Sequence, residues 1–314
     1  MLGLWITLGC LLGILLFTLT VSLICFFRIF YISDKAKLPK SEFDIPEGEV
    51  YEKHREGMIS WMKAVREMPC EELFITSFDG LTLHARYYEH GEGGPIEIML
   101  HGYKGNAERD LSGGVLRAKE LGHSVLLVDQ RAAGKSEGNV VSFGVLEKRD
   151  ALLWAKLLCE RFPDRKIILT GVSMGAATVM ACAGEALPPA VVGILADCGY
   201  SSAKAIIKKV MREMHLPADL LYPFAVLGAR LFGHFDLNET PPAEALTHAH
   251  VPVFFVHGTT DDFVPAYMSE ENYNACSSKK QLVFIEGAGH GLAYPINKEK
   301  YLSEMKAFFT PLVK

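Results

Sequence analysis

The chain has 314 residues, of which 49% are hydrophobic and 22% charged, and its formal net charge is −5. This is the balance of a globular protein that can bury a sizeable core. A nucleic-acid binder would show a basic face, so no nucleic-acid partner is expected. The seven cysteines are scattered, with no CxxC or Cys/His spacing, and this pattern predicts reduced thiols rather than disulfides or a metal site.

Residues 1–31 are predicted to form a transmembrane helix. No charged residue occurs from Leu2 to Phe27, and this run is longer than the roughly 20 residues that cross a hydrocarbon core. Trp5 and Tyr31 lie near its two ends, as interfacial anchors do. A cleaved signal peptide is the alternative, but the length of the run and the lack of a small-residue cleavage site argue against it.

The basic residues near this helix predict its orientation. None precedes it, whereas Arg28, Lys35, Lys37 and Lys40 follow it. Because the flank with more lysine and arginine stays inside, the domain that follows is expected in the cytoplasm.

Residues 32–70 are predicted to connect the membrane helix to the main domain. Residues 32–48 are polar, contain two prolines and show no periodicity, so they predict a linker. Residues 49–68 space their apolar side chains at a helical period and predict an amphipathic helix that packs on the domain. A helix on the membrane surface is the weaker alternative, because both signs of charge are mixed.

Residues 71–314 predict a single α/β domain. It starts with a hairpin over 72–88, and continuous runs of valine, isoleucine and leucine then alternate with helical stretches. Such runs indicate strands buried on both faces, hence a mostly parallel sheet flanked by helices. The expected strands are PIEIMLHG, HSVLLVDQ, KIILTGVS, AVVGILADC, VPVFFVHG and QLVFIEGAGH, and the expected helices are 106–121, 142–161, 174–185 and 297–309. Residues 199–240 exceed one crossover helix and predict a small helical lid.

The motif Gly171-Val172-Ser173-Met174-Gly175 lies where a predicted strand meets a predicted helix. A serine on so sharp a turn is lifted off the sheet, and the glycines let strand and helix approach closely. Ser173 is therefore the candidate nucleophile.

A serine hydroxyl needs a base, and the base needs an orienting acid. This fold supplies them after later strands, in the order acid then histidine. Asp261 follows the strand VPVFFVHG, and His290 lies in a glycine-rich loop after the last strand. Asp262 is the alternative acid. His101 and His257 precede glycines at strand ends and are interpreted as supporting turns.

An acyl-transfer site also needs donors for the oxyanion. The backbone N–H of Met174, directly after the nucleophile, is one candidate. The other is the N–H of Tyr103 in the loop HGYKG, and the Tyr103 side chain is a candidate wall of an acyl pocket. The segment DQRAAGKS, with Asp129 and Arg131, is interpreted as a structural tie between loops.

Five segments in this order, HGYKG, DQRAAGKS, GVSMG, HGTTDDFVP and GAGHG, resemble the α/β-hydrolase superfamily. Within it the chain is most similar to bacterial serine-aminopeptidase-like and esterase-like hydrolases with an N-terminal membrane segment. The resemblance covers about residues 72–312 and implies Ser173, Asp261 and His290 as a catalytic triad. One departure is Ala132, where the family usually has glycine.

The leading hypothesis is a membrane-tethered serine hydrolase that cleaves a carboxylic ester and needs no metal or organic cofactor. Its expected partners are a small-molecule or short-peptide acyl substrate and, through residues 2–31, the membrane. Two alternatives remain open: an amidase or aminopeptidase acting on short peptides, and a membrane scaffold that has lost catalysis.

Overall fold

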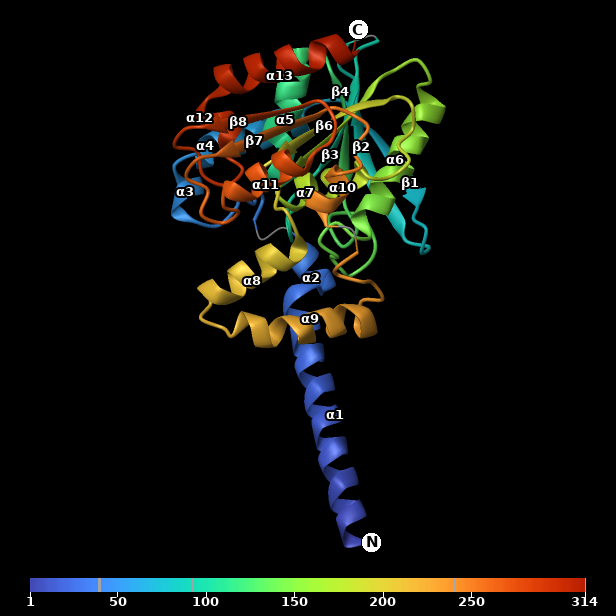
Figure 1. Cartoon of the computed structure of the whole chain (residues 1–314). Helices are drawn as coiled ribbons and strands as arrows, with labels where there is room; N and C mark the ends of the chain where they lie inside the picture. The colour runs from blue at the N-terminus through green and yellow to red at the C-terminus, as the bar shows by residue number, and fades with distance from the viewer. Residues whose placement is uncertain (39–40, 92, 240, 314) are drawn as a thin grey trace.

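An eight-stranded sheet forms the centre of the protein (Figure 1). The computed structural model describes residues 1–38, 41–91, 93–239 and 241–313. The strand order is β1-β2-β4-β3-β5-β6-β7-β8, in which β1, β2 and β4 pair antiparallel and β3 to β8 pair parallel. The strands are β1 (Glu71–Thr76), β2 (Thr82–Tyr88), β3 (Ile96–Leu100), β4 (Ser124–Asp129), β5 (Ile167–Val172), β6 (Val191–Asp197), β7 (Val253–Gly258) and β8 (Lys280–Ile285). The predicted mostly parallel α/β fold is confirmed.

Helices cover both faces of this sheet. Successive strand residues point to opposite sides, and here the residues on both sides are apolar and are buried under helices. In β4, Leu126 and Val128 pack with one cluster of buried side chains, and Val125 and Leu127 pack with another. The covering helices are α5 (Ala107–Leu121), α6 (Glu147–Arg161), α7 (Met174–Cys182), α10 (Pro242–Leu246), α11 (Tyr267–Ala275), α12 (Ala293–Ile296) and α13 (Lys298–Val313). Strands buried on both faces explain the unbroken apolar runs of the sequence.

The first helix, α1 (Leu2–Ile29), projects from the domain, and its N-terminal half stands apart from every other element (Figure 1). Among the described residues, it is the one helix that is both long enough and apolar enough to cross a membrane. Its last turns belong to the domain. Phe26 is buried, Phe30 is fully buried, and Phe30 O accepts a hydrogen bond from Val141 N.

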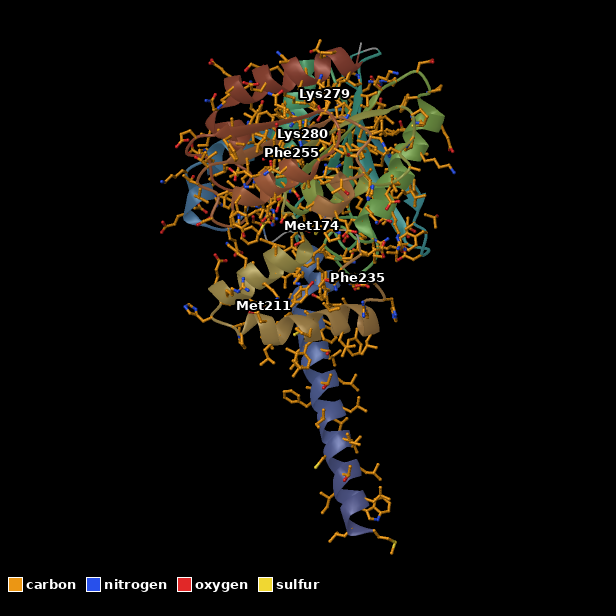
Figure 2. All side chains as sticks on the ribbon, in the orientation of Figure 1. Met174, Met211, Phe235, Phe255, Lys279 and Lys280 are labelled. Atoms are coloured by element: carbon orange, nitrogen blue, oxygen red, sulfur yellow. The ribbon has the colours of Figure 1, made fainter. Side chains whose placement is uncertain are left out.

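The described residues of the segment 199–240 contain two helices, α8 (Ala203–Glu213) and α9 (Ala218–Phe232). Figure 1 shows both between the sheet domain and the projecting part of α1, with α9 lying across α1. Met211 on α8 and Phe235 after α9 are labelled in this layer (Figure 2), and both are buried.

The segment before the sheet contains α2 (Asp34–Lys37), α3 (Glu49–Glu52) and α4 (Arg55–Arg66). The single helix predicted over 49–68 is thus broken at residues 53–54. α4 packs closely on α5, where Trp61 lies over Gly113 and leaves no room for a Cβ atom.

Candidate active site

Ser173 lies on the tight turn between β5 and α7, as its motif predicts. Its φ of +55° is in the left-handed region, which is strained for a residue with a side chain. A Cβ atom at Gly171 would collide with the backbone of Gly175, and one at Gly175 would collide with the Leu100 carbonyl. Only glycine fits at these two positions. The close packing that the two glycines allow places Ser173 at the carboxyl end of the sheet.

The structure brings Ser173, His290 and Asp261 together in one hydrogen-bonded relay. His290 Nε2 lies 2.9 Å from Ser173 Oγ, and His290 Nδ1 lies 2.7 Å from Asp261 Oδ2. An aspartate on Nδ1 fixes the tautomer in which Nε2 is free to accept the serine proton. The three residues come from loops after three different strands, β5, β7 and β8.

Asp261, and not its neighbour, is the acid in this relay. Its Oδ1 also accepts hydrogen bonds from the backbone N–H groups of Phe263 (3.0 Å) and Val264 (2.8 Å). Burial acts to raise the pKa of Asp261, but hydrogen bonds from His257 and His290 outweigh it and lower the pKa to about 2. Asp262 is exposed, and its backbone carbonyl accepts a hydrogen bond from Lys209.

His257 is a second histidine on the same carboxylate, which the sequence analysis did not anticipate. Its Nε2 lies 3.1 Å from Asp261 Oδ2 and 2.8 Å from the Val264 carbonyl, and its Nδ1 lies 2.6 Å from Ser269 Oγ. Since two acceptors face Nε2, that nitrogen carries a proton and Ser269 donates to Nδ1. His257 supports the turn, as interpreted, and it also holds Asp261 in place.

The two expected oxyanion donors flank Ser173. Within the described residues, the backbone N–H groups of Tyr103 and Met174 donate to no other group of the chain. Figure 2 places Met174 at the lower edge of the sheet domain, facing α8. Gly102, directly before Tyr103, packs so closely that an added Cβ atom would lie 3.5 Å from Ser173 Cβ.

The loop carrying Tyr103 is held by a carboxylate that sequence reasoning missed. Asp110 Oδ2 accepts a hydrogen bond from Gly102 N (3.0 Å), and Asp110 Oδ1 accepts one from Arg109 Nε (2.7 Å). The Tyr103 hydroxyl donates to the Ile29 carbonyl at the end of α1 (2.5 Å). Its burial raises the pKa of Tyr103, so the hydroxyl stays protonated.

An open cavity of about 950 Å³ lies in front of the relay. Tyr103, Val172 and Phe263 line one side of it, and the other side is lined by residues 44–51, here called the strap, together with Lys53 and Met58. The Tyr51 hydroxyl donates to the His290 carbonyl (3.0 Å). The strap was predicted only as part of a linker and a helix.

The described residues of 199–240 do not line this cavity. The segment therefore differs from the predicted lid, which would cover the triad directly. α8 does reach the rim, since Lys209 contacts the loop of Asp262 and Phe263. α9 instead packs on α1, through Gly228 and Phe224.

The segment DQRAAGKS has the structural role expected of it. Asp129 Oδ2 lies 2.8 Å from His84 Nδ1, and Arg131 forms hydrogen bonds to both Asp150 and Asp79. Neither residue lies in the cavity of the relay. Asp129 and Arg131 therefore do not pair with each other. Each connects this loop to a different part of the chain, Asp129 to β2 and Arg131 to Asp79 and Asp150.

Cys198, Asp261 and His290 place three potential metal-ligand atoms within 4.8 Å of one another. Two of them already form the relay, since His290 bridges Asp261 and Ser173. Burial raises the pKa of the Cys198 thiol well above its usual range, which disfavours the thiolate that binds metals. The arrangement is therefore better suited to proton transfer than to a metal ion.

The sheet order, the turn at Ser173 and the relay together are the arrangement of an α/β hydrolase. A family model described as "Alpha/beta hydrolase family" matches residues 98–297, and the chain belongs to this family. The resemblance seen in the sequence motifs is thereby confirmed, and membership supports hydrolase activity.

Curated relatives include the uncharacterized proteins YqkD of Bacillus subtilis and Rv2307c of Mycobacterium tuberculosis. The first is 29% identical over 191 residues, which cover 60% of this chain and 63% of that protein. The second is 27% identical over 243 residues, which cover 76% of this chain and 79% of that protein. The chain thus spans less than two thirds of the Bacillus protein.

Similar solved structures include the Pyrococcus furiosus esterase Pf2001, with a TM-score of 0.64 and 22% identity over 80% of this chain and 94% of that one. A puromycin-hydrolyzing peptidase of Mycobacterium tuberculosis has a TM-score of 0.61 and 19% identity over 78% of this chain and 39% of that one. At these identities the likeness establishes the fold alone.

Proposed function

We propose that this protein is a serine hydrolase that cleaves a carboxylic ester through an acyl-enzyme on Ser173. The observation that carries the proposal is the unbroken relay from Asp261 through His290 to Ser173. Three groups of the required types, at hydrogen-bonding distances and in the required order, meet beside an open cavity.

The chemistry follows from this geometry. Ser173 Oγ attacks the ester carbonyl while His290 Nε2 takes its proton, and Asp261 stabilises the imidazolium that forms. The N–H groups of Tyr103 and Met174 donate to the oxyanion. His290 then protonates the departing alcohol. Water, activated by the same histidine, releases the acid and restores the serine.

An amidase or aminopeptidase acting on short peptides is the second candidate. Acidic side chains occur on the cavity wall, including Asp44, Glu49 and Asp262, and such groups could hold the ammonium group of a peptide. Apolar residues such as Val50, Met58 and Phe263 line the same cavity and suit an acyl chain. Rates on nitrophenyl esters of rising chain length, compared with rates on aminoacyl amides, separate the two candidates.

We also propose that α1 is retained as a single membrane helix and that the catalytic domain faces the cytoplasm. Removal of α1 would take away buried Phe26, together with the Arg28 and Ile29 carbonyls that accept hydrogen bonds from Lys104 and Tyr103. This supports a retained helix over a cleaved signal sequence. The basic flank after the helix supports the orientation; of its residues, Lys40 lies outside the described part of the chain.

Labelling with a fluorophosphonate probe tests the nucleophile. We expect Ser173 to be labelled and Ser173→Ala to lose both labelling and hydrolysis with an unchanged thermal unfolding temperature, because only an activated serine reacts at a useful rate. Ser201→Ala, a buried serine outside the relay, is the matched control and should keep both. Labelling that persists in Ser173→Ala, or a wild-type chain that neither labels nor hydrolyses, would contradict the proposal and favour the catalytically silent scaffold.

A further inference from the structure

The helix α9 has an apolar face that the catalytic domain does not cover. Its residues recur three and four positions apart and therefore share one side of the helix. Leu220 is 65% exposed and Leu231 is 44% exposed. The face consists of Leu220, Pro223, Phe224, Leu227 and Leu231. The charged residues of α9 are Asp219 and Arg230, near its two ends, and each forms an ion pair.

The side of α9 next to this face packs on α1, and Phe224 lies at the border between the two. A Cβ atom at Gly228 would collide with the Ser22 carbonyl, so the two helices cross in close contact there. Phe224 meets Phe17 edge to face, with 6.3 Å between ring centroids, and Phe232 lies 5.8 Å from Phe26. In Figure 1 α9 lies across α1 at a steep angle, so it runs along the membrane plane wherever α1 crosses the membrane.

The length of α1 fixes the depth of this crossing. The part from Leu2 to Phe17, which lies below α9, is about 24 Å long at 1.5 Å per residue. A hydrocarbon core is about 30 Å thick, so this part alone is too short to span it. The uncharged run of α1 continues to Phe27, so the apolar length available to the hydrocarbon core includes the turns against which α9 packs.

We propose that α9 is a second membrane contact, an in-plane helix whose Leu220–Leu231 face lies in the lipid at the boundary of hydrocarbon and headgroups. A lipid surface is the occupant because the face continues the uncharged surface of α1 and has no charged residue within it. Met214 and Leu216, in the turn between α8 and α9, are further exposed apolar residues.

This placement has a consequence for the substrate, which rests on the proposed ester hydrolysis. The cavity-lining residues Tyr103 and Lys104 donate hydrogen bonds to the Ile29 and Arg28 carbonyls at the end of α1 (2.5 and 3.1 Å). The cavity therefore lies beside the point where α1 leaves the bilayer. An ester that partitions into the membrane, with a long acyl chain, is accordingly the substrate class that the site would meet first.

Fluorescence quenching by brominated lipid tests the membrane contact in the full-length protein. Trp5→Phe removes the tryptophan of α1, and Leu231→Trp is added to that background in phosphatidylcholine/phosphatidylglycerol vesicles. We expect the new tryptophan to be quenched. Ile296→Trp, at an exposed apolar position of the catalytic domain, is the control and should not be quenched. Equal quenching at the two positions overturns the proposal, and so does a blue-shifted but unquenched Leu231→Trp, which would mean that a second copy of the chain covers the face.

A rate comparison tests the substrate class separately. The double variant Leu220→Glu/Leu231→Glu should hydrolyse a long-chain ester presented in vesicles about tenfold more slowly, because charged residues displace the helix from the lipid. Its rate on a soluble acetyl ester should be unchanged. Equal effects on both esters, or on neither, overturn the substrate inference. A wild-type chain inactive on both esters contradicts the hydrolase proposal, while the quenching result still decides the membrane contact.

Discussion

At the scale of single residues, the choice between two adjacent aspartates has a clear structural basis. Asp261 accepts the His290 Nδ1–H, whereas Asp262 is exposed and only its backbone carbonyl forms a hydrogen bond. We expect Asp261→Asn to lower kcat by about 10⁴-fold, because the imidazole loses its orienting acid. Asp262→Asn, the matched control, should stay near the wild-type rate. Steady-state rates on one ester check this, and a dead Asp262→Asn would reverse the assignment.

A second residue-scale prediction concerns Ala132, which has a φ of +62° and is buried. An alanine in the left-handed region costs about 1–2 kcal/mol, and glycine relieves it at an entropic cost of about 0.5–1 kcal/mol. Ala132→Gly should therefore be neutral or more stable by up to about 1.5 kcal/mol. Ala133→Gly, in the same loop without positive φ, should lose about 1 kcal/mol. Chemical unfolding in detergent measures both, and an equal loss in the two variants would contradict the strain argument.

The residues with a motif around them were predictable, and those without one were not. Ser173, Asp261 and His290 each follow a recognisable strand, so their convergence follows from parallel topology. His257 also follows a strand, yet its contacts to Ser269 and Asp261 depend on how the next turn folds back. Asp110 lies in the first turn of α5, where an acidic residue is common for helix-dipole reasons alone. No local signal tied it to Gly102.

At the scale of elements, the position of the strap beside the cavity could not be predicted from the sequence. A strand or a helix is recognised by its apolar period, but nothing in residues 44–51 indicates the cavity that they line. Their place depends on long-range contacts, such as that of Tyr51 with His290 and that of Asp44 with Arg109. All eight strands could be predicted. The break at residues 53–54 within the predicted helix 49–68 could not, because the apolar period is that of α4 alone.

The strap also makes an element-scale prediction. The Tyr51 hydroxyl donates to the carbonyl of His290, the base itself. Tyr51→Phe should lower the free energy of unfolding by about 1 kcal/mol, the net value of such a bond, and reduce kcat several-fold by loosening the histidine loop. Tyr267→Phe is the matched control, since within the described residues the Tyr267 hydroxyl has no hydrogen-bond partner. Wild-type kcat and stability in Tyr51→Phe would show that the strap does not position His290.

At the scale of the whole molecule, the orientation across the membrane can be tested with reporters at the C-terminus. With the catalytic domain in the cytoplasm, a fluorescent-protein fusion should be bright and an alkaline phosphatase fusion inactive, because the phosphatase needs an oxidising compartment for its disulfides. The same pair fused to a chain with Arg28, Lys35 and Lys37 changed to glutamine is the control, and its bias should weaken. An active phosphatase on the unchanged chain would place the domain outside.

The close crossing of α1 and α9 also has a consequence for how the chain is made. Ser22 and Phe26 leave the ribosome long before Gly228, the residue they pack against. The first helix must therefore remain without this partner until nearly three quarters of the chain has been synthesised. A shortened chain that starts after Ile32 would finish synthesis without Phe26 and Phe30, which pack against Phe232 of α9 and against Phe143 and Phe235. Such a chain should aggregate, because α1 is a packing partner of the folded domain.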